Sequence, residues 1–333
     1  MEVIPMTIFK RLSAFLGAML LICMLLPVSA FAAGSIDPNR DVSLTISYRD
    51  GNTALQGASF SVYLVATVDE YGELTTTNNF ANYNVKIRGK NDAAWRTLAS
   101  TLEGYVLRDG LTPADKGTTD RQGSITFPST GKKLTQGLYL VIGSRLTQNG
   151  RRYDPAPFMA MLPAQNVTSN TWEYDIAVNA KYDSSAIPTN PPVTPGTTRI
   201  SRKVLKVWED KGFEAERPKE IEVQLLRGGE VYSTVKLNAA NNWRYTWTDL
   251  DSRYAWKVVE KELDGYTVTV TREGVTFVVT NTYGETIEDN ETPLSGELPK
   301  TGQLWWPVPV LIAAGLLFII IGLARRRGIR YEN

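Results

Sequence analysis

Apolar and polar residues alternate over short stretches along most of the chain, and this two-residue period is typical of half-buried β-strands. In the first half of the chain these stretches are residues 41–48, 57–65, 137–142, 158–162 and 172–178. Within the first stretch, Leu44, Ile46 and Tyr48 share one face. Glycine, aspartate and proline separate the stretches, with Asp50-Gly51 as a turn. Short alternating strands between turn residues predict a β-sandwich.

One stretch of the first half has helical spacing instead. Asp92 is the expected N-cap of this helix, and Asp109-Gly110 is its expected end. Between them, large apolar side chains recur every three or four residues, at Trp95, Leu98, Leu102 and Tyr105. The pattern predicts a short helical insert in the first sandwich.

Alternation resumes in the second half, at residues 204–208, 221–226, 265–270 and 277–282. Residues 187–196 between the two halves are rich in proline and predict an extended, semi-rigid connector. We therefore expect a first folded domain at residues 35–183, a linker at 184–196 and a second domain at 197–283. The two domains are expected to fold independently.

The N-terminus is uniformly apolar from residue 14 to residue 28, after Lys10 and Arg11. Ala30-Phe31-Ala32 follows, with the small residues of a signal peptidase site. Residues 1–32 therefore read as a secretory signal peptide, cleaved after Ala32 or after Ala30. Cys23, the only cysteine in the chain, lies inside it, so the exported protein is expected to have neither thiol nor disulfide.

A second apolar run covers residues 304–324, is long enough to cross a bilayer as a helix, and is followed by Arg325-Arg326-Arg327. Just before it stands the pentapeptide Leu298, Pro299, Lys300, Thr301 and Gly302. This order, at residues 298–333, resembles the cell-wall sorting signal of Gram-positive surface proteins. The resemblance implies that a sortase cuts between Thr301 and Gly302 and joins the Thr301 carbonyl to an amine. A plain C-terminal anchor is the alternative.

The acidic residues 284–297, which precede the pentapeptide, are expected to form a flexible spacer.

Composition removes several classes of function. The 333 residues carry a net charge of +1, so no electrostatic argument favours nucleic acid as a partner. There is no histidine, which excludes His-dependent catalytic triads and most zinc sites. We expect no enzyme that turns over, no cofactor and no metal site.

The first domain resembles the N-terminal domain of SpaA-type pilins, through Gly57-Ala58, Phe60 and Val62-Tyr63, the helix at 98–102, and Pro157-Phe158. Backbone pilins of that family end this domain with the motif WxxxVxVYPK, whose lysine accepts the next subunit. Here Trp172, Ile176, Val178 and Lys181 occupy the corresponding positions, but Asn179-Ala180 replaces the Tyr-Pro pair. Strand parity puts Trp172, Ile176 and Val178 on the buried face and Lys181 on the other side. The alternative is an ordinary last strand followed by a solvated lysine.

The second domain resembles the B-type repeat of collagen adhesins (CnaB), a transthyretin-like, Ig-like β-sandwich. In that family a lysine on the first strand and an asparagine on the last fuse into an isopeptide bond, with the help of an acid on a middle strand. The resemblance implies these roles for Lys206, Asn281 and Glu260, with Glu262 as the second choice of acid. Each of the three shares its strand face with large apolar residues: Val204, Trp208, Trp256, Val258, Phe277 and Val279.

Burial of these polar groups would lower the pKa of Lys206 and raise that of Glu260. A neutral Lys206 could then attack the Asn281 carbonyl, while a protonated Glu260 polarises that carbonyl. The alternative is a buried Lys–Glu ion pair with a hydrogen-bonded asparagine. In the first domain the first strand has no lysine, and Ile142 stands where such domains carry the glutamate, so no isopeptide bond is expected there.

The sequence thus predicts two tandem β-sandwiches and a C-terminal transmembrane sorting helix. The predicted function is a structural subunit of a sortase-assembled pilus, anchored to the cell wall, with a role in adhesion. Its expected partners are sortase, other pilin subunits, peptidoglycan, and a host matrix or surface receptor; the precursor would be held in the membrane. The alternatives are a minor basal or ancillary pilin and a non-polymerising wall-anchored adhesin.

Overall fold

The computed structural model describes residues 34–87, 91–166, 168–187 and 199–284, which lie in one compact unit. The predicted signal peptide, sorting pentapeptide and C-terminal apolar run lie outside the described residues. Within the described ranges, no helix is both long enough and apolar enough to cross a membrane.

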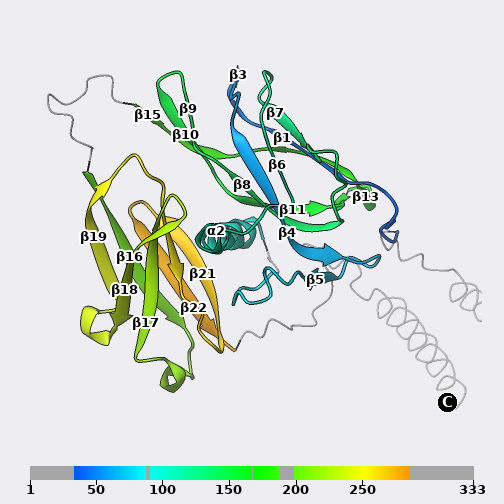
Figure 1. The fold of residues 1–333 in the computed structure, drawn as a ribbon. Coiled ribbons are helices and arrows are strands. Elements are labelled where there is room, and N and C mark those ends of the chain that lie inside the picture. Colours follow the sequence, from blue (N-terminus) through cyan, green and yellow to red (C-terminus); the bar gives the residue numbers. More distant parts are fainter. Residues whose placement is uncertain (1–33, 88–90, 167, 188–198, 285–333) are drawn as a thin grey trace, which may run out of the picture. The chain divides into compact units, whose positions relative to one another are not determined.

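The first domain is built from short strands and one α-helix (Figure 1). Its two larger sheets have the strand orders β14-β1-β7 and β11-β8-β4-β5, with β6 also paired to β4. Smaller sheets are β15-β10-β9, β12-β13 and β2-β3. The strands are β1 (Ser43–Ser47), β2 (Arg49–Asp50), β3 (Thr53–Ala54), β4 (Ser59–Val68), β5 (Leu74–Thr76), β6 (Asp115–Thr118), β7 (Ser124–Phe127), β8 (Gly137–Gly143), β9 (Leu146–Gln148), β10 (Arg151–Pro155), β11 (Phe158–Leu162), β12 (Ala164–Asn166), β13 (Thr171–Glu173), β14 (Asp175–Asn179) and β15 (Tyr182–Ala186).

The core of the first domain follows the alternation of its strands. Leu44, Ile46 and Tyr48 are fully buried on one face, as predicted, and pack with Phe60 and Val62 of β4. The last predicted strand, residues 172–178, is divided at Tyr174 into β13 and β14. β15 pairs with β10 and continues to Ala186, three residues beyond the predicted end of the domain.

The helical insert is α2 (Asp92–Asp109). Its N-cap is Asn91, whose side chain accepts a hydrogen bond from the Ala94 amide at 2.9 Å, so the expectation that Asp92 caps the helix is wrong. The reason is the backbone: Asn91 has the extended conformation that a cap requires, whereas Asp92 is already helical. Gly110 ends the helix in the left-handed conformation, as predicted.

The second domain is a sandwich of a four-stranded and a three-stranded sheet, ordered β19-β16-β22-β21 and β18-β17-β20. The first strand, β16, and the last, β22, are neighbours and run parallel. The strands are β16 (Arg199–Glu209), β17 (Glu220–Arg227), β18 (Glu230–Asn238), β19 (Arg244–Asp251), β20 (Trp256–Glu260), β21 (Tyr266–Glu273) and β22 (Thr276–Tyr283), and two 3₁₀ turns lie at Glu214–Glu216 and Ala239–Asn241. The described chain is therefore mainly β, with one α-helix.

Helix α2 belongs to the first domain by sequence but packs on β20 and β21 of the second. Its buried apolar residues, including Leu98 and Leu102, share one hydrophobic cluster with residues of the second sandwich. β21 is an edge strand, and two of its free amides find acceptors in the first domain. Val268 donates to the Asn84 carbonyl at 2.7 Å, and Val270 donates to Thr101 Oγ1 at 2.8 Å. The first domain thus satisfies an edge that would otherwise be open to pairing.

Candidate functional site

The three polar residues predicted to lie inside the second sandwich come from three strands: Lys206 from β16, Glu260 from β20 and Asn281 from β22. In the parallel β16–β22 ladder, Lys206 lies opposite Val279, and Trp208 lies opposite Asn281. Lys206, Glu260 and Asn281 are 4%, 1% and 0% exposed. Strand parity therefore predicted their inward orientation correctly.

The side chains of the three residues meet in the core. Asn281 Nδ2 donates to Glu260 Oε1 at 2.5 Å, and Lys206 Nζ lies 3.7 Å from Glu260 Oε2. The latter distance exceeds a hydrogen bond, and Lys206 Nζ instead donates to two backbone carbonyls, of Val207 at 2.8 Å and of Val279 at 3.3 Å. Glu260 Oε2 and Asn281 Oδ1 have no hydrogen-bond partner. Two buried acceptors are therefore left unsatisfied next to a buried amine.

Burial also sets the protonation of the pair. Desolvation lowers the pKa of Lys206, against the opposing attraction of Glu260 and Asp210. Desolvation likewise raises the pKa of Glu260, against the opposing effect of Lys206. Each shift disfavours the charged form, because a charge buried in the apolar core loses its hydration. Burial thus shifts the pair toward a neutral amine and a protonated carboxyl, and with its pKa lowered to about 8 Lys206 has a larger neutral fraction near pH 7 than a free lysine.

Aromatic rings close the site around Lys206. The Trp208 ring centroid is 4.2 Å from Lys206 Nζ, and Trp208 makes edge contacts with Trp243 and Tyr266. Asp210, which is 3% exposed, forms an ion pair with Arg217 next to this group. Sequence reasoning did not single out Asp210, although Asp210 has the same strand parity as Lys206 and Trp208. Parity alone does not identify Asp210, because it lies just after the end of β16.

The second choice of acid, Glu262, lies in a different environment. Its carboxylate accepts from Arg108 of α2 at 2.6 Å, and its side chain is 36% exposed. It makes no contact with Lys206 or Asn281 in the described part of the chain. The geometry therefore favours Glu260 as the acid. In the first domain, Ile142 of β8 is buried in an apolar cluster.

Lys181 lies between β14 and β15 with an exposed side chain. Its backbone is fixed, because its carbonyl accepts from the Ala156 amide at 2.8 Å. Trp172, Ile176 and Val178 lie partly buried against the core of the first domain. Parity thus placed all four side chains correctly, while the acceptor role of Lys181 stays a prediction. The pentapeptide from Leu298 to Gly302 lies outside the described residues.

No group of three or more Cys, Asp or Glu side chains within the described ranges could hold a metal ion.

Family models match both folded domains. Residues 42–181 match the Gram-positive pilin subunit D1, N-terminal domain, and residues 202–282 match the Cna protein B-type domain. The two matched stretches correspond to the two folded domains, in the same order along the chain.

Three individual proteins illustrate what the chain is similar to. A collagen adhesin of Staphylococcus aureus is 29% identical over 177 residues, which cover 53% of this chain and 14% of the adhesin. The full-length major pilin SpaD of Corynebacterium diphtheriae is 15% identical, over 74% of this chain and 65% of that one, with a TM-score of 0.29. A single B repeat unit of the S. aureus collagen-binding surface protein is 18% identical, over 73% of this chain and 98% of that one, with a TM-score of 0.25.

Proposed function

We propose that this chain is a structural subunit of a sortase-assembled pilus, and that Lys206 and Asn281 form an intramolecular isopeptide bond in its second domain. The observation that carries the cross-link is the convergence of a buried amine, a buried carboxyl and a buried amide from three strands. The match of the first domain to a Gram-positive pilin family supports the assembly role.

The proposed reaction uses each side chain once. In the structure Glu260 contacts Nδ2 of Asn281, so this amide first turns to let its carbonyl oxygen accept a hydrogen bond from protonated Glu260. The neutral Nζ of Lys206 then attacks Cγ of Asn281. Glu260 then transfers a proton to the departing amide nitrogen and takes one from the new Nζ–Cγ linkage. One ammonia leaves, and Glu260 ends in the protonation state in which it began. Because Lys206 and Asn281 are consumed, the protein is not a turnover enzyme.

Intact-mass measurement of residues 34–298 tests the cross-link directly. We expect a mass lower than the sequence mass by one ammonia. Glu260→Gln should restore the full mass, because glutamine cannot relay the protons. Glu262→Gln is the matched control and should keep the mass deficit. A wild-type protein with the full sequence mass would overturn the proposed cross-link and would leave the pilin assignment to be decided separately.

Polymerisation is proposed to join the Thr301 carbonyl of one subunit to Lys181 Nζ of the next, with attachment to peptidoglycan at the base of the fibre. The exposure of Lys181 on a fixed segment supports its role as acceptor. In cells with the pilin sortase, wall extracts should give a high-mass ladder on denaturing gels. Lys181→Ala should abolish the ladder, whereas Lys132→Ala, at another exposed lysine, should not.

The altered Asn179-Ala180 pair favours a second candidate function. In that case the chain is a basal or ancillary pilin, or a wall-anchored adhesin that does not polymerise. A ladder that persists in Lys181→Ala would exclude Lys181 as the acceptor. The absence of a ladder in the wild type, with single copies released from the wall, would favour the adhesin.

A further inference from the structure

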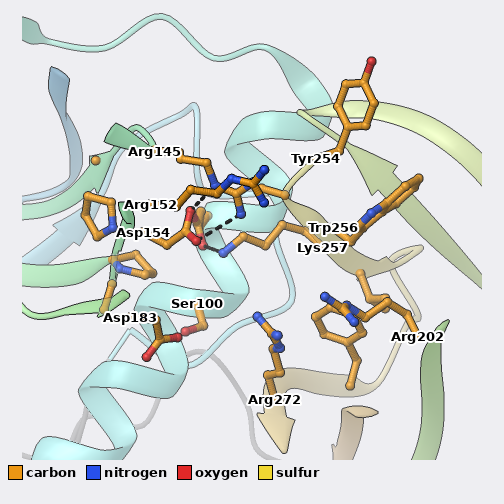
Figure 2. Close-up of a pocket in the computed structure, with 18 of the residues that line it drawn as sticks. Ser100, Arg145, Arg152, Asp154, Asp183, Arg202, Tyr254, Trp256, Lys257 and Arg272 are labelled. Atoms are coloured by element: carbon orange, nitrogen blue, oxygen red, sulfur yellow. Dashed lines mark hydrogen bonds and ion pairs between the residues drawn. The ribbon is translucent and has the colours of Figure 1, made fainter. Parts of the chain in front are cut away.

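A cavity of about 540 Å³ lies beside helix α2 and is lined by residues of both domains (Figure 2). Its volume falls within the range of small-molecule binding pockets. None of Lys206, Glu260 and Asn281 lines it, so it is separate from the proposed cross-link. The cavity therefore needs its own explanation.

Basic side chains outnumber acidic ones around the cavity, at five to three. Two of the carboxylates are already paired, Asp154 with Arg145 at 2.6 Å and Glu103 with Lys257 at 2.5 Å. The third, Asp183, is exposed. Among the described residues no carboxylate forms an ion pair with the three remaining cations, which are Arg152, Arg202 and Arg272. The cavity thus presents unneutralised positive charge.

Arg202 and Arg272 carry this excess into the second sandwich, from β16 and β21 (Figure 2). Arg202 Nε is buried without a hydrogen-bond partner, while its Nη1 donates to the Ser201 carbonyl at 2.9 Å. Burial, and secondly the charge of Arg272, lowers the pKa of Arg202. One bound anion would offset the repulsion between Arg202 and Arg272 and would also accept a hydrogen bond from Arg202 Nε.

The rest of the lining indicates which anion fits. Hydroxyl groups of Ser100, Ser252 and Thr271 line the cavity, together with the apolar rings of Trp256 and Phe277. Guanidinium groups bind a planar carboxylate through two parallel hydrogen bonds. Hydroxyl groups beside apolar rings suit a compact ligand that has several hydroxyls of its own.

We propose that this cavity binds an acidic sugar, with its carboxylate between Arg202 and Arg272 and its hydroxyls toward the serine and threonine side chains. The sugar is either free or the terminal unit of a glycan. This site is independent of the isopeptide chemistry and would give the subunit a ligand of its own.

Calorimetric titration of residues 34–298 tests this site with three probes. Glucuronic acid should bind, whereas glucose, which has a hydroxymethyl group in place of the carboxylate, should not bind measurably. Inorganic phosphate should bind at least about tenfold more weakly, because it cannot use the hydroxyl lining. Methyl glucuronide distinguishes the two sources, since it binds only if the site accepts a terminal glycan unit. Equal binding of glucose, no binding of glucuronic acid, or preference for phosphate would each overturn the proposal.

Variants locate the binding. Arg272→Gln and Arg202→Gln should each weaken glucuronic acid binding by about tenfold or more, the typical effect of losing a charge-assisted hydrogen bond. Arg121→Gln removes one exposed positive charge that does not line the cavity, and should leave binding unchanged. Arg272 is exposed, so its variant is expected to fold, which thermal unfolding verifies. Unchanged binding in a folded Arg272→Gln protein would contradict the proposed site.

Discussion

Lys206, Glu260 and Asn281 occupy a place where polar side chains are costly, and their unsatisfied oxygens increase that cost. Formation of the proposed bond would replace the titratable amine of Lys206 and the side-chain amide of Asn281 by one amide, which leaves Glu260 as the only titratable group of the three. A sandwich without the bond would retain the whole penalty. A protein in which the bond does not form should therefore have a lower free energy of unfolding than one in which it does.

Glu260→Gln is expected to lower the free energy of unfolding by roughly 4 kcal/mol. A cross-link between Lys206 and Asn281 closes a loop of about 75 residues, and the estimate is the chain entropy of closing such a loop. Urea denaturation of residues 34–298 measures it, with Glu262→Gln as the control. A variant as stable as the wild type would show that no loop is closed.

Asp210 should make stability depend on pH. Its hydrogen bonds with Arg217 hold the pKa of Asp210 below the usual 3.8. The folded state therefore binds fewer protons than the unfolded state, so this contribution is complete above about pH 4 and is lost as the pH falls through the lowered pKa. Denaturation midpoints of wild type and Asp210→Asn between pH 2 and 6 should converge at the acid end. A difference that does not depend on pH would contradict this.

At the level of strands, alternation was sufficient to predict which way the three side chains point, whereas their selection as a site came from the resemblance to the B-type repeat. Lys206, Glu260 and Asn281 share parity with large apolar residues, and a strand has only two faces, so one buried face determines where they point. Asp210 has the same parity but precedes Lys211-Gly212, and such a position reads as a turn. Its burial depends on Arg217, which lies seven residues further along a loop. The alternation of apolar and polar residues within one strand cannot predict this ion pair.

The partner of α2 was not predictable for a similar reason. Helical spacing shows that Leu98, Leu102 and Tyr105 face a core, but not which core. In the structure Tyr105 donates to the backbone carbonyl of Glu260, in the other domain, at 3.1 Å. The cavity proposed to bind an acidic sugar is likewise lined by residues from both domains, so the sequence of neither domain alone predicts it.

Gly104→Ala tests the contact of α2 with the second domain. In an ordinary helix interior this change stabilises by roughly 0.5–1 kcal/mol. Here a Cβ at Gly104 would lie 2.8 Å from Val259 Cγ2, so we expect a net destabilisation of about 1–3 kcal/mol. Urea unfolding measures the sign of the change. A stabilised variant would mean that α2 does not pack on β20.

On the scale of the whole molecule, the shared hydrophobic cluster and the covered edge of β21 couple the two domains. We expect residues 34–298 to unfold in a single calorimetric transition, because exposure of α2 removes core contacts from both sandwiches. Leu102→Ala should separate the transition into two, by weakening the shared cluster. Two transitions in the wild type would show that the domains are energetically independent.

The parallel arrangement of β16 and β22 has a mechanical consequence. The chain enters the second domain at the start of one strand and leaves at the end of its neighbour, so a pull on the two ends shears the whole ladder. Once the proposed bond forms, tension passes from Lys206 directly to Asn281, and the intervening residues carry none of it. In single-molecule pulling, Glu260→Gln should release about 75 further residues, roughly 250 Å of extended chain. The cross-linked domain would then behave as an almost inextensible segment whose interior never experiences the force.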